Sequence, residues 1–190
     1  MTEATNSQEV LIRVQPTPNP SAFKFVLDRS VLNDGKATFS AKEECYGNRL
    51  AEDLLDVPGV KQVHFFSNVI TLTFEETIDF DRACQESCAV IQTRMAVHDP
   101  NFNMQTAKKS NRQNLSPELQ KVEEILDRTI RPGLQGDGGD IEVVGLEGKK
   151  LFVHYEGACG TCPSATSGTL MAIEGIIRDE FDPEIEVVPV

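Results

Sequence analysis

The stretch from Ile141 to Pro163 reads IEVVGLEGKKLFVHYEGACGTCP and decides the fold of the second half of the chain. Two β-rich runs, Ile141–Leu146 and Lys150–Tyr155, flank Glu147-Gly148, a turn pair typical of a hairpin. A Cys-x-x-Cys motif follows the hairpin, and the proline directly after the motif favours the first turn of a helix. The stretch therefore predicts a hairpin that leads through a cysteine loop into a helix.

The flanking sequence extends this hairpin into a small α+β unit, residues 115–190. Ser116-Pro117 is a helix start, because serine caps the first turn and proline fits the first helical position. We expect that helix to end at Arg131-Pro132-Gly133, and a second helix to run from about Pro163 to Phe181. A final strand is expected near Ile185–Val188. The predicted order is α-β-β-α-β, with the helices on one face of the sheet.

The first half predicts a second small unit of mixed helices and strands, residues 10–97. Alternating apolar runs indicate strands, and helical spacing of leucines precedes a Val-Pro-Gly stop. The expected strands are Val10–Val14, Ala22–Leu27, Ala37–Ser40, and the hairpin of Val60–Phe66 with Val69–Phe74; the expected helices are near Leu50–Leu55 and Asp81–Met95.

Residues 98–114 are expected to link the two units. This stretch is polar, lacks periodicity and contains Lys108-Lys109-Ser110-Asn111-Arg112. The two sides of the linker also differ in charge: residues 115–190 hold 15 acidic against 6 basic residues, and residues 1–114 hold 15 against 12. Such asymmetry indicates two units with different partners.

Composition excludes several classes of protein. The chain has 190 residues and a formal net charge of −12, and a chain this acidic repels nucleic acid and anionic membranes. No apolar run approaches the roughly 20 residues that span a bilayer. We therefore expect neither a nucleic-acid partner nor a membrane partner.

The five cysteines, an odd number, argue against a framework of disulfides. Met1–Val10 contains no Lys or Arg and no apolar core, so it resembles neither a signal peptide nor a transit peptide. Free or metal-bound thiols in a reducing compartment are expected. We predict a cytoplasmic protein, or one of the mitochondrial matrix if a transit peptide has been removed.

The Cys159 and Cys162 pair is the strongest candidate for chemistry. Glycines at 157 and 160 let the backbone wrap closely around an ion or a cluster. The start of a helix after Cys162 favours thiolate, and a pair of thiolates suits Zn²⁺, Cu(I) or an iron–sulfur cluster. A closed site needs four ligands and the motif supplies two, so the simplest completion is a second copy of the chain.

Beyond the ligand pair, the chain resembles the NifU/Nfu family of iron–sulfur cluster scaffolds and carriers. Val122–Val190 is similar to its C-terminal domain, and residues 10–94 are similar to the Nfu N-terminal domain. The matching stretches of the C-terminal part are Ile130-Arg131-Pro132, Asp137-Gly138-Gly139-Asp140, Gly157-Ala158-Cys159, Cys162-Pro163-Ser164 and Gly168–Glu174; those of the N-terminal part are Pro16-Thr17-Pro18-Asn19-Pro20, Phe23-Lys24-Phe25, Pro58-Gly59-Val60 and Val69-Ile70-Thr71-Leu72.

The resemblance implies a carrier without catalytic residues, not an enzyme. Cys159 and Cys162 match the family's ligand positions, for a [4Fe–4S] cluster bridged between two subunits. The implied partners are donor proteins of cluster assembly, recipient apo iron–sulfur proteins, and a second copy of the chain, which would join as a homodimer on cluster binding. Residues 10–97 would recognise a client or a donor.

Two other functions use the same cysteine pair. A thiol–disulfide oxidoreductase is one, although its motif usually follows a βαβ strand, not a hairpin. A zinc protein completed by dimerisation is the other, since Zn²⁺ accepts four thiolates. The remaining cysteines are expected to be apolar packing residues (Cys84 and Cys88, four apart on a helix) or incidental (Cys45).

Overall fold

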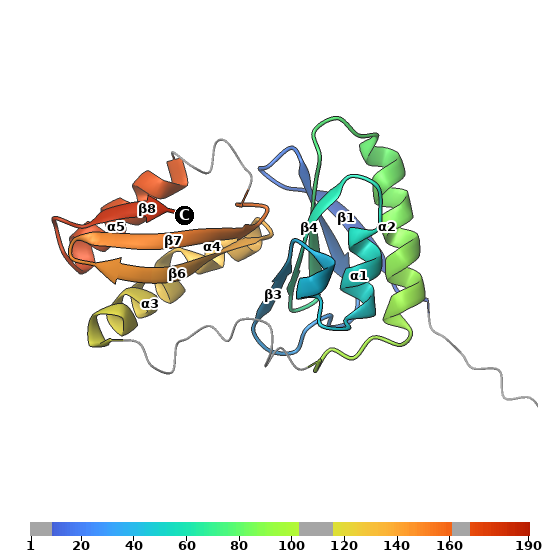
Figure 1. Cartoon of the computed structure of the whole chain (residues 1–190), viewed down its shortest axis with the longest axis horizontal. Helices are drawn as coiled ribbons and strands as arrows, with labels where there is room; N and C mark the ends of the chain where they lie inside the picture. The colour runs from blue at the N-terminus through green and yellow to red at the C-terminus, as the bar shows by residue number, and fades with distance from the viewer. Residues whose placement is uncertain (1–8, 103–115, 161–167) are drawn as a thin grey trace, which may run out of the picture.

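The computed structural model describes residues 9–102, 116–160 and 168–190, and forms two lobes (Figure 1). Each lobe combines one β-sheet with helices, which confirms an α+β fold built from two small domains. The hydrophobic residues form one core cluster in each lobe, and the two clusters share no buried residue.

The first lobe is a five-stranded antiparallel sheet with two helices packed on one face. Its strand order is β1-β2-β5-β4-β3. The bounds agree closely with the predicted strands and helices, and the β4–β5 hairpin begins and ends where the sequence placed it. The elements are β1 (Ile12–Pro16), β2 (Ala22–Leu27), β3 (Lys36–Phe39), η1 (Lys42–Glu44), α1 (Arg49–Leu55), β4 (Val60–Phe66), β5 (Val69–Phe74) and α2 (Phe80–Met95).

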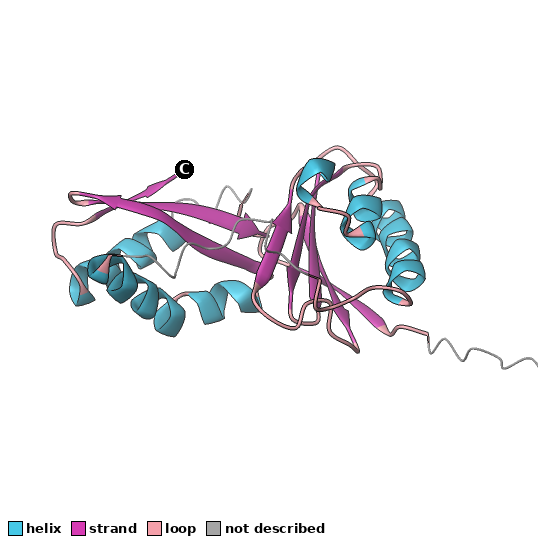
Figure 2. Ribbon diagram, turned by 60° about the horizontal axis from the view of Figure 1, so that its bottom comes forward, coloured by secondary structure: helices cyan, strands magenta, loops and turns pink. Residues whose placement is uncertain are grey.

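The alternation of side chains along the strands gives this sheet two different faces. Phe65 and Ile70, paired across β4 and β5, are fully buried in the core with the helices. The opposite face carries a polar row across four strands, in which Thr38 pairs with His64, His64 with Thr71, and Thr71 with Lys24. In Figures 1 and 2 the sheet lies between its own helices and the second lobe. The polar face is therefore the one turned toward the second lobe.

The second lobe has a three-stranded sheet, order β6-β7-β8, in which β6 and β7 are antiparallel and β7 and β8 are parallel. Ser116 caps the first helix as predicted, because its Oγ accepts a hydrogen bond of 3.3 Å from Leu119 N. Fully buried aliphatic side chains, including Val122, Leu151 and Ile177, join helices and sheet. The elements are α3 (Pro117–Thr129), α4 (Arg131–Gly136), β6 (Gly139–Glu147), β7 (Lys150–Gly157), α5 (Leu170–Glu180) and β8 (Glu186–Pro189).

The short helix α4 is the main departure from the predicted order. The first helix ends at Thr129, as Arg131-Pro132-Gly133 predicts, but the chain then bends at Ile130 and forms a further short helix before Gly138, which the sequence did not predict. Pro132 is tolerated there because the N–H groups of a first helical turn need no partner within the helix. The observed order is α-α-β-β-α-β. The residues that would join Cys162 to α5, 161–167, lie outside the described structure.

The first residues of the predicted linker belong to the first lobe. His98 Nε2 lies 2.7 Å from the carbonyl of Val31, and Asn33 N donates to the carbonyl of Pro100 at 3.0 Å. The ring of Phe102 stacks edge-on against the buried Phe65. The polar, aperiodic sequence gave no signal for these contacts; residues 103–114 lie outside the described structure.

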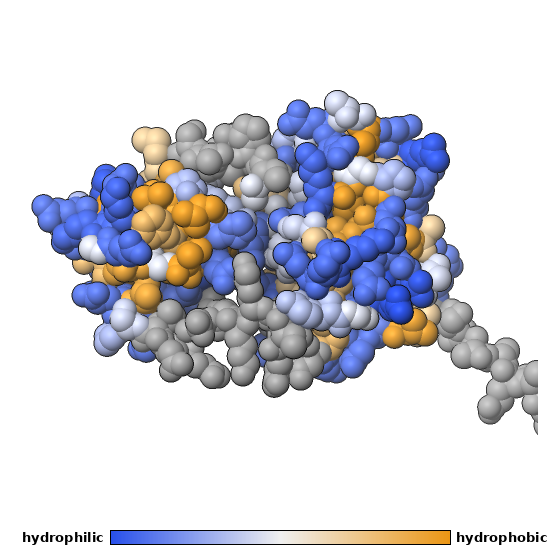
Figure 3. Space-filling view, viewed as in Figure 1, coloured by the Kyte–Doolittle hydropathy of each residue, from blue (hydrophilic) through white to orange (hydrophobic). Residues whose placement is uncertain are grey.

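Most of the surface is polar, with an apolar area over the three-stranded sheet (Figure 3). Val144 on β6 and Val190, which follows β8, are among the large exposed apolar side chains of the chain, at 59% and 61% exposure. Within the described ranges, no helix is both long and apolar enough to cross a membrane.

Arg131 joins α3, α4 and β6 through a buried network of charges. Its guanidinium lies 2.7 Å from a Glu123 carboxylate oxygen, 2.5 Å from Asp127 and 3.5 Å from Asp140. It also donates to the carbonyl of Ile141 at 3.2 Å. Arg131 and Asp140 are 3% and 2% exposed, so each buried charge depends on the other partners for compensation.

We predict that Arg131→Ala lowers the free energy of unfolding of the second lobe by about 3–5 kcal/mol, because it leaves buried carboxylates without their cation. Arg128→Ala is the matched control. Arg128 pairs with Glu180 on the surface, so its loss should change stability by no more than about 0.5 kcal/mol. Denaturant unfolding of both variants measures the difference, and equal stabilities would show that the network contributes nothing.

Candidate metal centre

The cysteine loop leaves β7 through a backbone turn that is tied to the start of β6. Gly157 has a φ of +61°, a conformation that favours glycine. Ala158 N donates to the carbonyl of Gly138 at 3.1 Å, and Gly160 N donates to the carbonyl of Gly157 at 3.1 Å. These bonds fix the loop as far as residue 160. Cys162 lies outside the described residues, so the structure locates one of the two predicted ligands.

Cys159 packs its sulfur against a glycine on the neighbouring strand. A methyl group at position 139 would lie 2.4 Å from Cys159 Sγ and 2.9 Å from Cys159 N, closer than atoms can approach. A methyl group at Gly157 would lie 2.5 Å from the carbonyl oxygen of Gly138. The missing side chains at 139 and 157 therefore provide the space in which the loop and its thiol sit.

The surroundings of Cys159 are partly apolar and partly charged. The thiol contacts the second core, and Tyr155 lies close by. Burial raises the pKa of Tyr155 to about 12, and the nearby Cys159 contributes to the same shift. Asp140, next to Gly139, is neutralised by Arg131 and by Lys36 of the first lobe, which is 3.4 Å away. The phenol therefore stays protonated, and the buried Asp140 carboxylate is paired with two cations.

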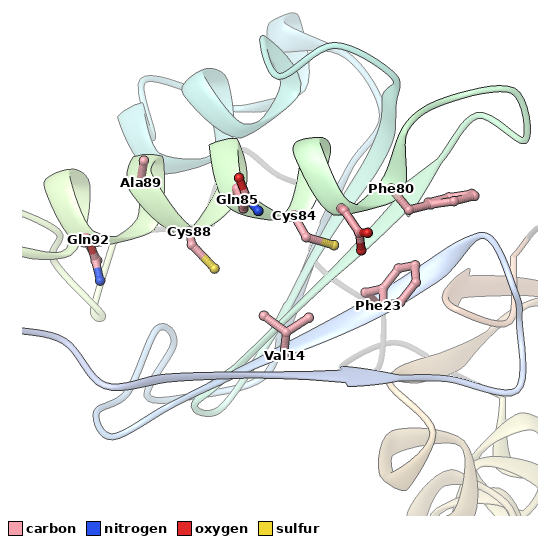
Figure 4. A pocket seen from close by; sticks show the side chains of 9 residues that line it. Val14, Phe23, Phe80, Cys84, Gln85, Cys88, Ala89 and Gln92 are labelled. Carbon is pink, nitrogen blue, oxygen red and sulfur yellow. The ribbon is translucent and has the colours of Figure 1, made fainter.

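The other cysteines lie far from the loop, on the helix side of the first lobe. Cys45 is buried in the first core, and burial raises the pKa of its thiol to about 11. Figure 4 shows Cys84 and Cys88 pointing into a shallow groove beside Val14 and Phe23. Burial raises the pKa of Cys84 to about 11, and the neighbouring Cys88 contributes to the same shift. Burial keeps these thiols protonated. Cys84 and Cys88 pack against apolar side chains, as their helical spacing predicted, and Cys45, expected to be incidental, is a core residue.

Both histidines of interest have backbone or side-chain partners. His154 Nδ1 lies 2.9 Å from the carbonyl of Val190, and His64 Nδ1 lies 2.9 Å from Thr38 Oγ1. Burial lowers the pKa of His64, and Glu156 and Asp140 oppose that shift. Within the described part of the chain, no group of three or more His, Cys, Asp or Glu side chains is placed to hold a metal ion.

One residue of the first lobe reaches the loop, and the sequence reading did not single it out. Asn19 is 2% exposed, and its Nδ2 donates to the carbonyl of Ala158 at 2.9 Å, next to Cys159. The run of prolines around it excluded a helix and a central strand, but nothing in that run shows which residue it would present. An asparagine between two prolines is typical of a turn, but it does not indicate a contact with a residue 139 positions away.

The arrangement fits a thiolate-bound metal centre carried at the end of a hairpin. Cys159 supplies a soft ligand, and the glycines at 139 and 157 let the backbone pack so closely around it that a methyl group at either position would overlap its neighbours.

Two sequence families match the chain. The family described as "Scaffold protein Nfu/NifU N terminal" matches residues 12–98, and the one described as "NifU-like domain" matches residues 122–188. The two matches coincide with the two lobes and together cover most of the chain.

Individual relatives match over nearly the whole chain. NifU-like protein 4, mitochondrial, of Arabidopsis thaliana is 29% identical over 193 residues, which cover 93% of this chain and 68% of the relative. NFU1 iron-sulfur cluster scaffold homolog, mitochondrial, of Homo sapiens is 29% identical over 181 residues, with 94% and 71% covered. The solution structure of a NifU-like protein from Saccharomyces cerevisiae aligns at 18% identity with a TM-score of 0.44, covering 50% of this chain and 87% of that one.

We predict that Gly139→Ala destabilises the second lobe by about 1–3 kcal/mol, because the added methyl overlaps Cys159 and forces the loop to move. Gly145→Ala is the matched control on the same strand, where a methyl group meets no atom within 4 Å. The control should change stability by no more than about 0.5 kcal/mol. Denaturant unfolding compares the two, and equal effects would mean that the contact at Gly139 does not constrain the loop.

Proposed function

Because the chain belongs to the Nfu/NifU family of iron–sulfur cluster scaffold proteins, we propose that it holds a [4Fe–4S] cluster between two copies of itself and transfers it to apoproteins. The single observation that carries this proposal is the setting of Cys159. Its thiol, one of the two cysteines of the Cys-x-x-Cys motif, is at the end of a hairpin, in a loop that backbone hydrogen bonds and closely packed glycines hold in place.

The number of ligands supports the shared site. A [4Fe–4S] cluster takes four thiolates, and the Cys-x-x-Cys motif provides Cys159 and Cys162. The remaining cysteines lie in the first lobe: Cys45 is inside its core, and Cys84 and Cys88 are on α2, on the far side of the sheet from the loop (Figure 1). Two chains together supply the missing pair, with the cysteines of one motif from each.

The cluster is cargo in this proposal, and the protein is a carrier, not a catalyst. A cluster held at a contact between subunits is released when that contact opens, whereas a cluster enclosed in one core is not. The free energy of metal–thiolate bonding then appears as association of the two chains. Recipient apoproteins with stronger or more numerous ligands would draw the cluster away.

The first lobe, residues 10–97 with the segment to Phe102, would recognise donors or recipients of the cluster. It has its own core and lacks a Cys-x-x-Cys motif. Residues 103–114 would link it to the cluster-binding lobe, residues 115–190. The names of the relatives favour the mitochondrial alternative for the location of this chain over the cytoplasm.

We predict that Cys159→Ser or Cys162→Ser removes nearly all bound iron and sulfide, because either change leaves the shared site with two thiolates in total. Anaerobic reconstitution, followed by iron and sulfide analysis and visible absorbance, measures the loss. Zinc analysis of the same samples tests the zinc alternative, and dithiol turnover tests the oxidoreductase.

Cys88→Ser is the matched control, since this thiol lies in the groove of the first lobe. It should bind as much iron and sulfide as the unmodified chain. A full cluster in Cys159→Ser would place the ligands elsewhere and contradict the proposal.

A further inference from the structure

We propose that the polar face of the five-stranded sheet, with the proline-rich turn beside it, is a docking surface for the Cys159 loop of the same chain. We further infer that this docked state competes with the partner subunit for the loop. The second step rests on the proposed function; the first does not.

The polar face is buried although none of the described helices of its own lobe covers it. Thr71, Thr73 and His64 lie on this face and are each 1% exposed. One face of an antiparallel sheet in a small domain ordinarily meets water when it carries polar residues. Here the second lobe covers it, with β4 and β5 in contact with β7 (Figure 2).

The loop approaches this face closely enough that side chains are excluded from its backbone. A methyl group at Gly157 would lie 3.2 Å from the His64 ring, and one at Gly138 would lie 2.7 Å from Lys24 and 2.9 Å from Thr71. The polar row across the sheet thus meets the two glycine-containing turns that frame Cys159. The turns of the second lobe therefore pack directly against the sheet of the first lobe.

The proline-rich turn presents Asn19 to the loop. Thr17 Oγ1 donates to the carbonyl of Asn19 at 2.9 Å, and Ser21 N donates to Asn19 Oδ1 at 3.0 Å. Flanking prolines restrict the backbone further, so the amide is held in place before it meets its partner. Its Nδ2 then satisfies the carbonyl of Ala158, the residue before the cluster ligand.

Charge complementarity adds to these contacts. Lys36 Nζ lies 2.7 Å from a Glu156 oxygen and 3.4 Å from Asp140, and donates to the carbonyl of Ile141 at 3.1 Å. Lys24 Nζ also donates to the carbonyl of Gly136. Two lysines of the first lobe therefore meet the acidic lobe at its cysteine end, where a second acidic lobe would be repelled.

The docked loop is not arranged to receive a shared cluster. Cys159 Sγ lies against Gly139 and the second core, while Asn19 and the sheet face cover Ala158 beside it. A bridging cluster requires a second chain's loop within a few bond lengths of the same sulfur. The sheet face and the partner subunit therefore compete for the same loop, and cluster loading would release the first lobe.

Small-angle X-ray scattering of the apo chain tests the docking without any cluster. The unmodified chain should show the dimensions of the docked structure. Lys36→Glu should show a larger radius of gyration, because it places a third carboxylate beside those of Asp140 and Glu156. Adding Glu156→Lys should restore the compact form by exchanging the pair. Lys42→Glu is the control: Lys42 pairs with Asp56 inside its own lobe and should leave the profile unchanged.

Circular dichroism checks that each variant is folded. If Lys36→Glu does not fold, Asn19→Ala is a second variant that should give the open form. An unmodified apo chain that is already extended, or folded Lys36→Glu and Asn19→Ala variants that both stay compact, would overturn the docking surface.

A second experiment tests the competition by measuring the yield of cluster-bound dimer at limiting iron and sulfide. A variant that scatters as open should give a higher yield than the unmodified chain. An equal yield from a variant that scatters as open would overturn the competition. If scattering behaves as expected but no variant binds a cluster, the docking surface stands and the proposed function falls.

Discussion

The close approach of the chain to itself at Gly139 is the constraint on which the candidate site depends. The thiol of Cys159 occupies the volume that any side chain at position 139 would fill, and the neighbouring Ala158 N is bonded to the carbonyl of Gly138. The β6–β7 ladder brings these two segments together, because it pairs Gly139 with Gly157 at its end. The cysteine loop is therefore an extension of the sheet, held by backbone contacts that glycine alone permits.

A chain of buried charges connects this point to both lobes. Arg131 holds Asp140 from the helical side of the second lobe, and Lys36 meets Asp140 and Glu156 from the first. Buried charges are tolerated when each has a partner of opposite charge. When one partner is lost, the desolvation free energy of the remaining charge is no longer compensated. The same carboxylate thus contributes to the stability of the second lobe and to its contact with the first.

Much of this organisation could be predicted from the sequence, because it is local. Strand alternation, the capping Ser116 and the turn residues placed the two hairpins and most of the helices, and the cysteine spacing is what predicts Cys159 and Cys162 as ligands. Two features could not be predicted from the local sequence. Asn19 meets Ala158 across 139 positions, and the helix from Arg131 to Gly136 forms in spite of a proline and two glycines. Hydrophobic periodicity carries no information on either.

The measurement that tests the central claim most directly is native mass spectrometry of the anaerobically reconstituted, unmodified chain. A cluster carried between two Cys-x-x-Cys motifs predicts a species with the mass of two chains and one [4Fe–4S] cluster, which returns to apo chains when a chelator removes the iron. A single chain that retains a whole cluster would contradict the account, because the ligands would then have to come from one chain alone.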